Sequence, residues 1–348
     1  MSRKRKVFIA VWVTIPFVML FIAASVRPLR QSGAGQNITA NTPESDSSGG
    51  ELTPAAGTVV VGIGRGADHA AVTAQAIANA GGLERIVSKG DTVIIKPNLS
   101  SSRGTLTYPG NTDYRVVAEV VRQAREAGAG RIIVAEGAGT GRPLSDPVIR
   151  QIRYNTIAGV EFLDLNTIPK EDCYFVSSPN RVTREPIYMP KIYVDADVVI
   201  SVPKLKTNYA VGPSLGLKNG FGAPPKPLVN DGSAWKLGLH RRGIPNSIVE
   251  INLLRKPDFV VIDGILAGEG NGPTSNSPID ARIVFAGADV MAVDTIAAYF
   301  MGFNPQNVPH LKLAAENGIG EYRMERIEVA GADIHEIRMD FDSPFPKD

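Results

Sequence analysis

The fold is decided by three consecutive segments, TVVVGI at 58–63, HAAVTAQAIANA at 69–80 and DTVIIK at 91–96. The first and third are short, apolar and rich in β-branched residues, which is typical of buried strands. The Ala-rich segment between them predicts a helix. Strand, helix and strand in this order form a βαβ unit, in which the two strands run parallel. We therefore expect an α/β domain.

The same alternation continues along the chain. Further strands are expected at 131–135, 160–163, 198–202, 259–262 and 283–286, and further helices at 113–127, 146–158, 248–254, 289–301 and 310–317. This pattern predicts a doubly wound, mostly parallel sheet with helices on both faces, covering 58–336 and followed by a C-terminal tail at 337–348. Three connections rich in Pro and Gly exceed the length of ordinary loops, and we expect them to form the walls or lids of a site: 177–191, 219–246 and 264–281.

The N-terminal end has the composition of a membrane anchor. Residues 7–26 carry no charge, and at about 1.5 Å per residue they match a hydrocarbon core of about 30 Å. Four bases precede this segment and only Arg27 and Arg30 follow closely, so the positive-inside rule predicts a cytoplasmic tip and an exported body. We expect residues 1–30 to stay as a single-pass anchor. The small residues at 23–25 leave cleavage by signal peptidase, and hence secretion, as the alternative.

Residues 31–57 have the composition of a disordered tether. Their only large aliphatic side chains are Ile38 and Leu52, among many Gly, Ser, Thr, Asn and Pro residues. Such a segment cannot bury a core. We therefore expect the α/β domain to be held outside the cytoplasm of a bacterium, in the periplasm or at the cell surface.

The composition also argues against several classes of function. Of the 348 residues, those from 58 onward hold 31 bases and 32 acids, so no basic face for nucleic acid is expected. Cys173 is the only cysteine, and this chain alone cannot form a disulfide or a Cys-ligated iron–sulfur cluster. The four histidines lie far apart, which gives a histidine metal site no local support. The Walker A and HExxH motifs are absent from the sequence.

Polar residues follow three of the predicted strands, where open α/β sheets bind their ligands. Lys204 and Lys206 alternate along an extended segment and would point the same way, which brings two ammonium groups together unless an anion lies between them. We therefore predict a pocket for a carboxylate or phosphate, with charge from Lys96, Lys204, Lys206 and Lys218 and hydrogen bonds from Asn98, Asn208 and Asn219. The alternative is that these lysines lie on solvated loops.

Four acids are candidates for a hard cation such as Mg²⁺ or for a general base: Asp263, Glu269, Asp289 and Asp294. Asp289 follows a strand and opens a helix, which predicts an N-cap. Asp294 lies inside that helix among apolar residues, where a carboxylate needs a partner. We expect that partner to be a lysine.

Two glycine clusters resemble nucleotide-binding loops. GIGRGA at 62–67 matches GxGxxA, but the second strand ends in Lys96 and Pro97, where a dinucleotide site would place an acid, and this disfavours NAD binding. GAGTG at 137–141, next to Glu136, either wraps an anion with its backbone amides or forms a tight turn.

Taken in order, these segments resemble the prokaryotic family called domain of unknown function 362. The similarity covers roughly 59–331 and is carried by KPNL at 96–99, VISVPKLKTN at 199–208, GLKNGFG at 216–222, VIDGILAGEGNGP at 261–273 and DVMAVD at 289–294. The resemblance implies an α/β domain in which the following residues converge on one site: Lys96, Asn98, Lys204, Lys206, Lys218, Asn219, Asp263, Glu269 and Asp294. It implies no particular reaction.

Two departures from the family pattern affect function. Many relatives carry histidine where this chain has Asn208, which puts proton transfer at this position in doubt. Some relatives carry cysteine-rich, ferredoxin-like segments, and this chain has none, so no iron–sulfur cluster is expected.

These observations lead to an extracytoplasmic domain that binds a small anionic molecule. As an enzyme, it would use Lys204 and Lys206 to stabilise developing charge, while Asp263 or Glu269, with or without Mg²⁺, positions the reacting atom. As a binding module, it would only capture the anion at the cell envelope. In a third interpretation the motifs are turns that determine the fold, and the surface serves a protein partner.

Overall fold

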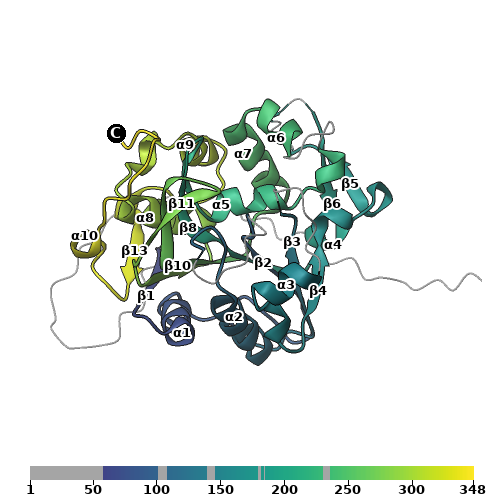
Figure 1. Ribbon diagram of the computed structural model, residues 1–348, viewed down its shortest axis with the longest axis horizontal. Coiled ribbons are helices and arrows are strands. Elements are labelled where there is room, and N and C mark those ends of the chain that lie inside the picture. Colours follow the sequence, from purple (N-terminus) through teal and green to yellow (C-terminus); the bar gives the residue numbers. More distant parts are fainter. Residues whose placement is uncertain (1–57, 101–107, 139–145, 179–181, 184, 230–235) are drawn as a thin grey trace, which may run out of the picture. The chain divides into compact units, whose positions relative to one another are not determined.

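A mixed, mostly parallel sheet of eleven strands forms the frame of the chain in the computed structural model (Figure 1), which describes residues 58–100, 108–138, 146–178, 182–183, 185–229 and 236–348. The strands of this sheet are β1 (Val59–Arg65), β2 (Thr92–Pro97), β3 (Arg131–Glu136), β4 (Glu161–Asp164), β7 (Val198–Val202), β8 (Lys204–Asn208), β9 (Gly212–Ser214), β10 (Phe259–Asn271), β11 (Ser275–Ile279), β12 (Ile283–Gly287) and β13 (Ile327–Ala330). A separate hairpin pairs β5 (Cys173–Val176) with β6 (Ile187–Pro190).

The strand order is β13-β1-β12-β10-β7-β2-β3-β4, with β8 and β11 paired to β10 and β9 paired to β8. Strands β10, β7, β2, β3 and β4 run parallel to one another, and β1 runs parallel to β13. Strand β12 is antiparallel to both β1 and β10. The cause is that β10 continues to Asn271 and turns back into β11, so the chain enters β12 from the opposite direction.

Two hydrophobic cores lie on opposite faces of this sheet. Along β2, Ile94 packs into one core while Val93 and Ile95 pack into the other, as the alternation of side chains on a strand requires. Figure 1 shows the helices covering the two faces. The helices are α1 (His69–Asn79), α2 (Tyr114–Glu126), α3 (Asp146–Gln151), α4 (Lys191–Val194), α5 (Gly216–Asn219), α6 (Leu237–Arg241), α7 (Ile244–Arg255), α8 (Val290–Phe300), α9 (Pro309–Glu316) and α10 (Ile334–Ile337).

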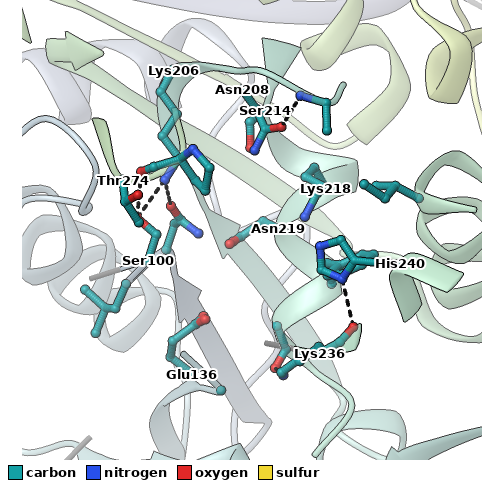
Figure 2. A pocket seen from close by; sticks show the side chains of 18 of the residues that line it. Ser100, Glu136, Lys206, Asn208, Ser214, Lys218, Asn219, Lys236, His240 and Thr274 are labelled. Carbon is teal, nitrogen blue, oxygen red and sulfur yellow. Dashed lines mark hydrogen bonds between the residues drawn. The ribbon is translucent and has the colours of Figure 1, made fainter. Parts of the chain in front are cut away.

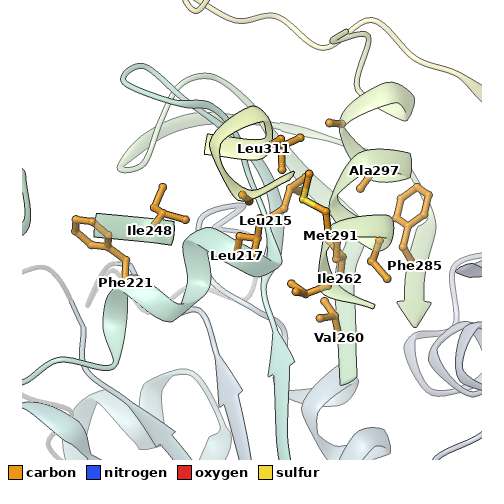
Figure 3. Close-up of a cluster of buried hydrophobic side chains, with 14 of the residues drawn as sticks. Leu215, Leu217, Phe221, Ile248, Val260, Ile262, Phe285, Met291, Ala297 and Leu311 are labelled. Atoms are coloured by element: carbon orange, nitrogen blue, oxygen red, sulfur yellow. The ribbon is translucent and has the colours of Figure 1, made fainter. Parts of the chain in front are cut away.

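Helices α1 and α2 supply one core, and α7, α8 and α9 supply the other. Figure 3 shows the second core around α5 and α8, where Leu215, Leu217, Met291 and Phe285 interdigitate. Each fully buried aliphatic or aromatic side chain of this kind stabilises the fold by roughly 1.5–3 kcal/mol. The short helix α5 is thereby fixed against α8 next to the carboxyl ends of the strands.

Glycines in β1 have a packing role. A Cβ added at Gly62 would lie 2.2 Å from the carbonyl oxygen of Ala76, and one at Gly64 would lie 2.0 Å from that of Val72. Both oxygens belong to α1, so the two glycines let this helix lie directly on the strand. Close packing therefore explains the GxGxxA pattern without a nucleotide.

The predicted cap of one helix is confirmed, and the predicted length of another is wrong. Asp289 caps α8 as predicted, because its side chain accepts hydrogen bonds from the backbone N–H groups of Met291 and Ala292. The helix predicted at 146–158 is too long: α3 ends at Gln151, and Arg153 has a left-handed backbone with φ of 63°.

The expected anchor at 1–30 and the expected tether at 31–57 lie outside the described residues. Within the ranges that the structure does describe, no helix has both the length and the apolar character needed to cross a membrane.

Candidate functional site

A cavity of about 590 Å³ opens beyond the carboxyl ends of β2, β3 and β8 (Figure 2). Its wall consists of Asn98, Leu99, Ser100, Glu136, Gly137, Lys206, Asn208, Tyr209, Ala210, Ser214, Lys218, Asn219, Phe221, Gly222, Lys236, Leu237, His240, Ile244, Pro273 and Thr274. The long segment 219–246 supplies seven of these residues and 264–281 supplies two. No described residue of 177–191 lines the cavity.

Lys206 is fully hydrogen-bonded inside the wall. Its ammonium group donates to Asn98 Oδ1 at 2.7 Å, to Ser100 Oγ at 2.9 Å and to the carbonyl oxygen of Gly110 at 2.8 Å. An ammonium group has three N–H donors, so all of them have acceptors. Burial, followed by repulsion from Lys218, lowers the pKa of Lys206 to about 7. Lys206 therefore orients the amide of Asn98 rather than presenting a free charge.

Lys96 and Glu136 form a buried ion pair beside the cavity. Burial lowers the pKa of Lys96 and raises that of Glu136, and the attraction between the two opposes both shifts. Whichever atom holds the shared proton, the pair contributes no net charge. Asn219 supports it by donating from its amide nitrogen to the backbone oxygen of Lys96 at 2.9 Å.

Lys218 differs from the other lysines of the cavity. Its Nζ atom lies 3.7 Å from the centre of the Phe221 ring, which is a cation–π contact. Among the residues that the structure describes, its ammonium group has neither a hydrogen-bond acceptor nor a carboxylate partner. Burial and repulsion from Lys96 lower the pKa of Lys218 to about 7.

Lys236 and His240 form the wall next to Lys218. The ammonium group of Lys236 donates to the carbonyl oxygens of Gly222 at 2.7 Å and Pro224 at 2.6 Å. Burial lowers its pKa to about 7. His240 Nδ1 lies 2.9 Å from the carbonyl oxygen of Lys236, one turn earlier.

The carbonyl oxygen of Lys236 only accepts hydrogen bonds, so Nδ1 of His240 carries the proton of the neutral ring. Burial lowers the pKa of His240, which favours this neutral form. Its Nε2 atom then carries a lone pair, for which the described residues provide no hydrogen-bond donor. Phe221 contacts both neighbours, since its ring also lies edge-on to the His240 ring at 5.3 Å. Figure 2 shows Lys218 and His240 on the same side of the cavity, away from Lys206.

Asn208 presents a hydrogen-bond donor to the same space. Its Oδ1 atom accepts from the backbone N–H of Ala210 at 2.8 Å, which fixes the orientation of the amide. The NH₂ end has no acceptor in the described part of the chain. Asn208, Lys218 and His240 therefore keep free polar atoms at the cavity.

Lys204 and Asp263 lie together but away from this cavity. They form a buried ion pair at 2.8 Å, and Asp263 also accepts from the backbone N–H of Asp113, the residue that caps α2. The prediction that Lys204 and Lys206 share one anion is not realised, because each lysine has its own protein partners. A shift of register between β8 and β10 separates the residues paired with Lys204 and Lys206.

Asp294 and Glu269 also lie apart from the cavity wall. Asp294 is fully buried and accepts from the backbone N–H groups of Gly216 and Leu217 at 2.7 and 2.8 Å. The predicted lysine partner is wrong: Asp294 holds the start of α5. Burial raises the pKa of its carboxyl group to about 7. Glu269 accepts from the backbone N–H of Asp342 at 3.0 Å near the C-terminal end.

The candidate magnesium ligands do not converge. Asp263 is held by Lys204, and Glu269 lies elsewhere on β10. Within the described ranges, no cluster of three or more His, Cys, Asp or Glu side chains is placed to hold a metal ion.

Two residues of the cavity wall were not predicted from the sequence. Lys236 and His240 were not expected at the site, although their segment 219–246 was expected to form a site wall. Their spacing of four residues, on a segment that α6 makes helical, is the signal that could have indicated a shared face. The contact with Lys218 depends on how α5 and α6 pack, which no local pattern indicates.

Comparison with known proteins identifies the family. Residues 93–299 match the family described as Domain of unknown function (DUF362), which is more than half of the chain. The chain belongs to the DUF362 family. A thylakoid-associated protein of Synechocystis sp. is 29% identical over 250 residues, covering 69% of this chain and 71% of that protein.

Two solved structures are similar to this chain at low identity. The lactate racemase apoprotein from Thermoanaerobacterium thermosaccharolyticum gives a TM-score of 0.44 at 13% identity, covering 75% of this chain and 57% of that chain. A protein from Thermotoga maritima gives a TM-score of 0.41 at 13% identity, covering 72% and 60%. The chain thus spans less than two thirds of the length of either structure.

Proposed function

We propose that this DUF362 protein binds a small organic anion, a carboxylate or a phosphate, in the cavity at the strand ends. The observation that carries the proposal is the side chain of Lys218, a half-buried lysine whose ammonium group lines the cavity with no acceptor in the described part of the chain. A charge that is largely withdrawn from water and has no partner is costly, and an anionic ligand would supply the missing partner.

The charge balance of the wall supports an anion over a cation. Lys206, Lys218 and Lys236 are basic groups, whereas Glu136, the one carboxylate among the described residues of the wall, is paired with Lys96. Burial is the main cause that lowers the pKa of each cavity lysine, with repulsion from neighbouring lysines second, and a bound anion would oppose both effects. Anion binding is therefore expected to be coupled to proton uptake.

The size and lining of the cavity support an organic anion over a small inorganic one. A volume of about 590 Å³ lies within the usual range of about 300–1,000 Å³ for small-molecule sites. Apolar side chains share the wall with the polar groups: Leu99, Tyr209, Ala210, Phe221, Leu237, Ile244 and Pro273. The free NH₂ group of Asn208 would orient the anionic end.

The test is calorimetric titration of the purified full chain with a panel of carboxylates and phosphates. Lys218→Gln should weaken binding of the best ligand at least about tenfold, the scale of one charged hydrogen bond. Lys312→Gln is the matched control, because Lys312 is exposed on α9. Equal affinity of the Lys218 variant and wild type for every anion would refute the proposal. Binding without turnover would favour a binding module over an enzyme.

We also propose that the domain is held outside the cytoplasm at a membrane by residues 7–26. The support is the uncharged segment with its four preceding bases and the relative in Synechocystis, which is named as thylakoid-associated. Protease added to intact spheroplasts should digest the domain of the full chain. Protection from protease until lysis would refute an external domain, and recovery of a shortened chain in the medium would indicate cleavage and secretion.

A further inference from the structure

We propose that Lys218 forms an imine with an aldehyde or ketone, so that the ligand of this cavity is an oxo acid. This inference rests on the proposed anion site and adds a carbonyl group to its ligand. An imine-forming lysine needs an amine that is free of strong hydrogen-bond acceptors, space for a substrate, and a neighbouring group that moves protons.

Hydrogen bonding distinguishes Lys218 from the other lysines of the wall. The ammonium group of Lys206 has three acceptors and that of Lys236 has two backbone carbonyls. Attack on a carbonyl group requires a free nitrogen lone pair directed at the substrate, so either of these lysines would first have to break its hydrogen bonds. Lys218 has an aromatic ring on one side and the cavity on the other. The three lysines share a pKa of about 7, so geometry separates them.

His240 provides the proton-transfer group. Its Nδ1–H donates to the carbonyl oxygen of Lys236, which leaves Nε2 as the acceptor of the ring. His240 and Lys218 both contact Phe221 and lie on the same side of the cavity (Figure 2). In this proposal Nε2 takes the proton that the amine must lose.

The reaction balances without an oxidant or a second substrate. The neutral Lys218 nitrogen forms a bond to the carbonyl carbon, the carbonyl π electrons move to oxygen, and His240 passes one proton from nitrogen to oxygen to give a carbinolamine. His240 then passes the second nitrogen proton to the departing hydroxyl group, which leaves as water while the C=N bond forms. The resulting imine can take up a proton from solvent, and the iminium then places a positive charge beside the carboxylate of the oxo acid.

The experiment uses the full chain with pyruvate and glyoxylate as oxo acids, propionate as an acid without a ketone or aldehyde group, and acetone as a ketone without a charge. Each is incubated with sodium cyanoborohydride, which reduces an imine to a stable amine, and adducts are located by peptide mass mapping. We expect pyruvate or glyoxylate to label Lys218 at least about tenfold more than Lys206, Lys236 or the exposed Lys312, because few exposed lysines are neutral near pH 7.

The controls separate this inference from the proposed anion site. Propionate should bind without an adduct, acetone should label weakly, and His240→Gln should slow labelling by pyruvate at least about tenfold. Equal labelling of the lysines overturns the inference. It is also overturned if calorimetry detects binding of pyruvate or propionate but neither oxo acid labels Lys218, and the anion site then stands. Absence of both binding and labelling overturns both proposals.

Discussion

Replacing Lys218 with methionine should stabilise the ligand-free protein at neutral pH. Methionine is unbranched and similar in length, so it can fill the space of the lysine stem beside Phe221 without the charge. The folded pKa of Lys218 is about 7, against an ordinary value of 10.5. At about 1.4 kcal/mol for each pKa unit, holding the charged form in the fold costs on the order of 5 kcal/mol.

The sign of the pH dependence follows from the proton count. Between about pH 7 and pH 10 the unfolded chain holds a proton on Lys218 that the folded protein has lost, so the stability of the wild type rises with pH. The methionine variant lacks this term. Removing the charge should stabilise the variant by about 4 kcal/mol at pH 7, and losing the cation–π contact should cost about 1 kcal/mol. The net advantage of the variant is therefore about 3 kcal/mol at pH 7 and should shrink to about 1 kcal/mol at pH 9.

Thermal unfolding of the full chain in mild detergent measures this difference. For a domain of this size, each kcal/mol shifts the midpoint by about 2 °C, so the variant should melt several degrees above wild type at pH 7 and much closer to it at pH 9. Lys312→Met is the control and should change stability by less than about 0.5 kcal/mol. A Lys218→Met midpoint below wild type at both pH values would show that Lys218 already has a partner. An advantage that does not shrink with pH would show that the fold does not lower the pKa of Lys218.

Three further predictions follow from the same geometry. Affinity for an organic anion should fall by up to about tenfold per pH unit above pH 8, as Lys218 loses its proton. A dissociation constant that calorimetry finds to be independent of pH would contradict binding through charge. Lys204→Met should destabilise the fold by about 3–5 kcal/mol, because Asp263 stays buried without its ion pair. The affinity of the folded variant for an anion should be unchanged. Weaker binding at an unaltered melting temperature would instead place Lys204 at the site. Gly62→Ala should cost about 1–3 kcal/mol in a melting experiment by pushing α1 off β1, and a neutral result would mean that the helix can move without cost.

The parts of the fold that local sequence determines were predictable. Segments such as 92–97 and 198–202 are short apolar runs, and the alternation with α1 and α2 follows from the change of hydrophobic period. The direction of β12 was not predictable, because it depends on β10 continuing past the expected end at 262 and turning into β11. Such strand pairings are non-local, and the residues of 264–279 read as a Gly- and Pro-rich loop.

Part of the site was predictable because ligands of open α/β sheets bind at the carboxyl ends of the strands. This rule selected Asn98, Lys206 and Asn208, all of which line the cavity. It also selected Asp263 and Lys204, which follow strands in the same way but turn to each other. Which of two alternating lysines faces a cavity depends on the irregular pairing between β8 and β10, and this is a property of the assembled sheet.

The role of Lys218 emerges only when the partners of every nearby lysine are compared. Lys96 has Glu136, Lys204 has Asp263, and Lys206 has three oxygen acceptors, so each of these charges is balanced or hydrogen-bonded inside the protein. A protein gains nothing in stability by leaving one more half-buried ammonium group without an acceptor. Replacing it with methionine would remove the cost, so its presence at the cavity is best explained by a ligand that interacts with that nitrogen. An anion would be attracted to the protonated form and a carbonyl group would react with the neutral form, and a pKa of about 7 makes both forms available at the same pH.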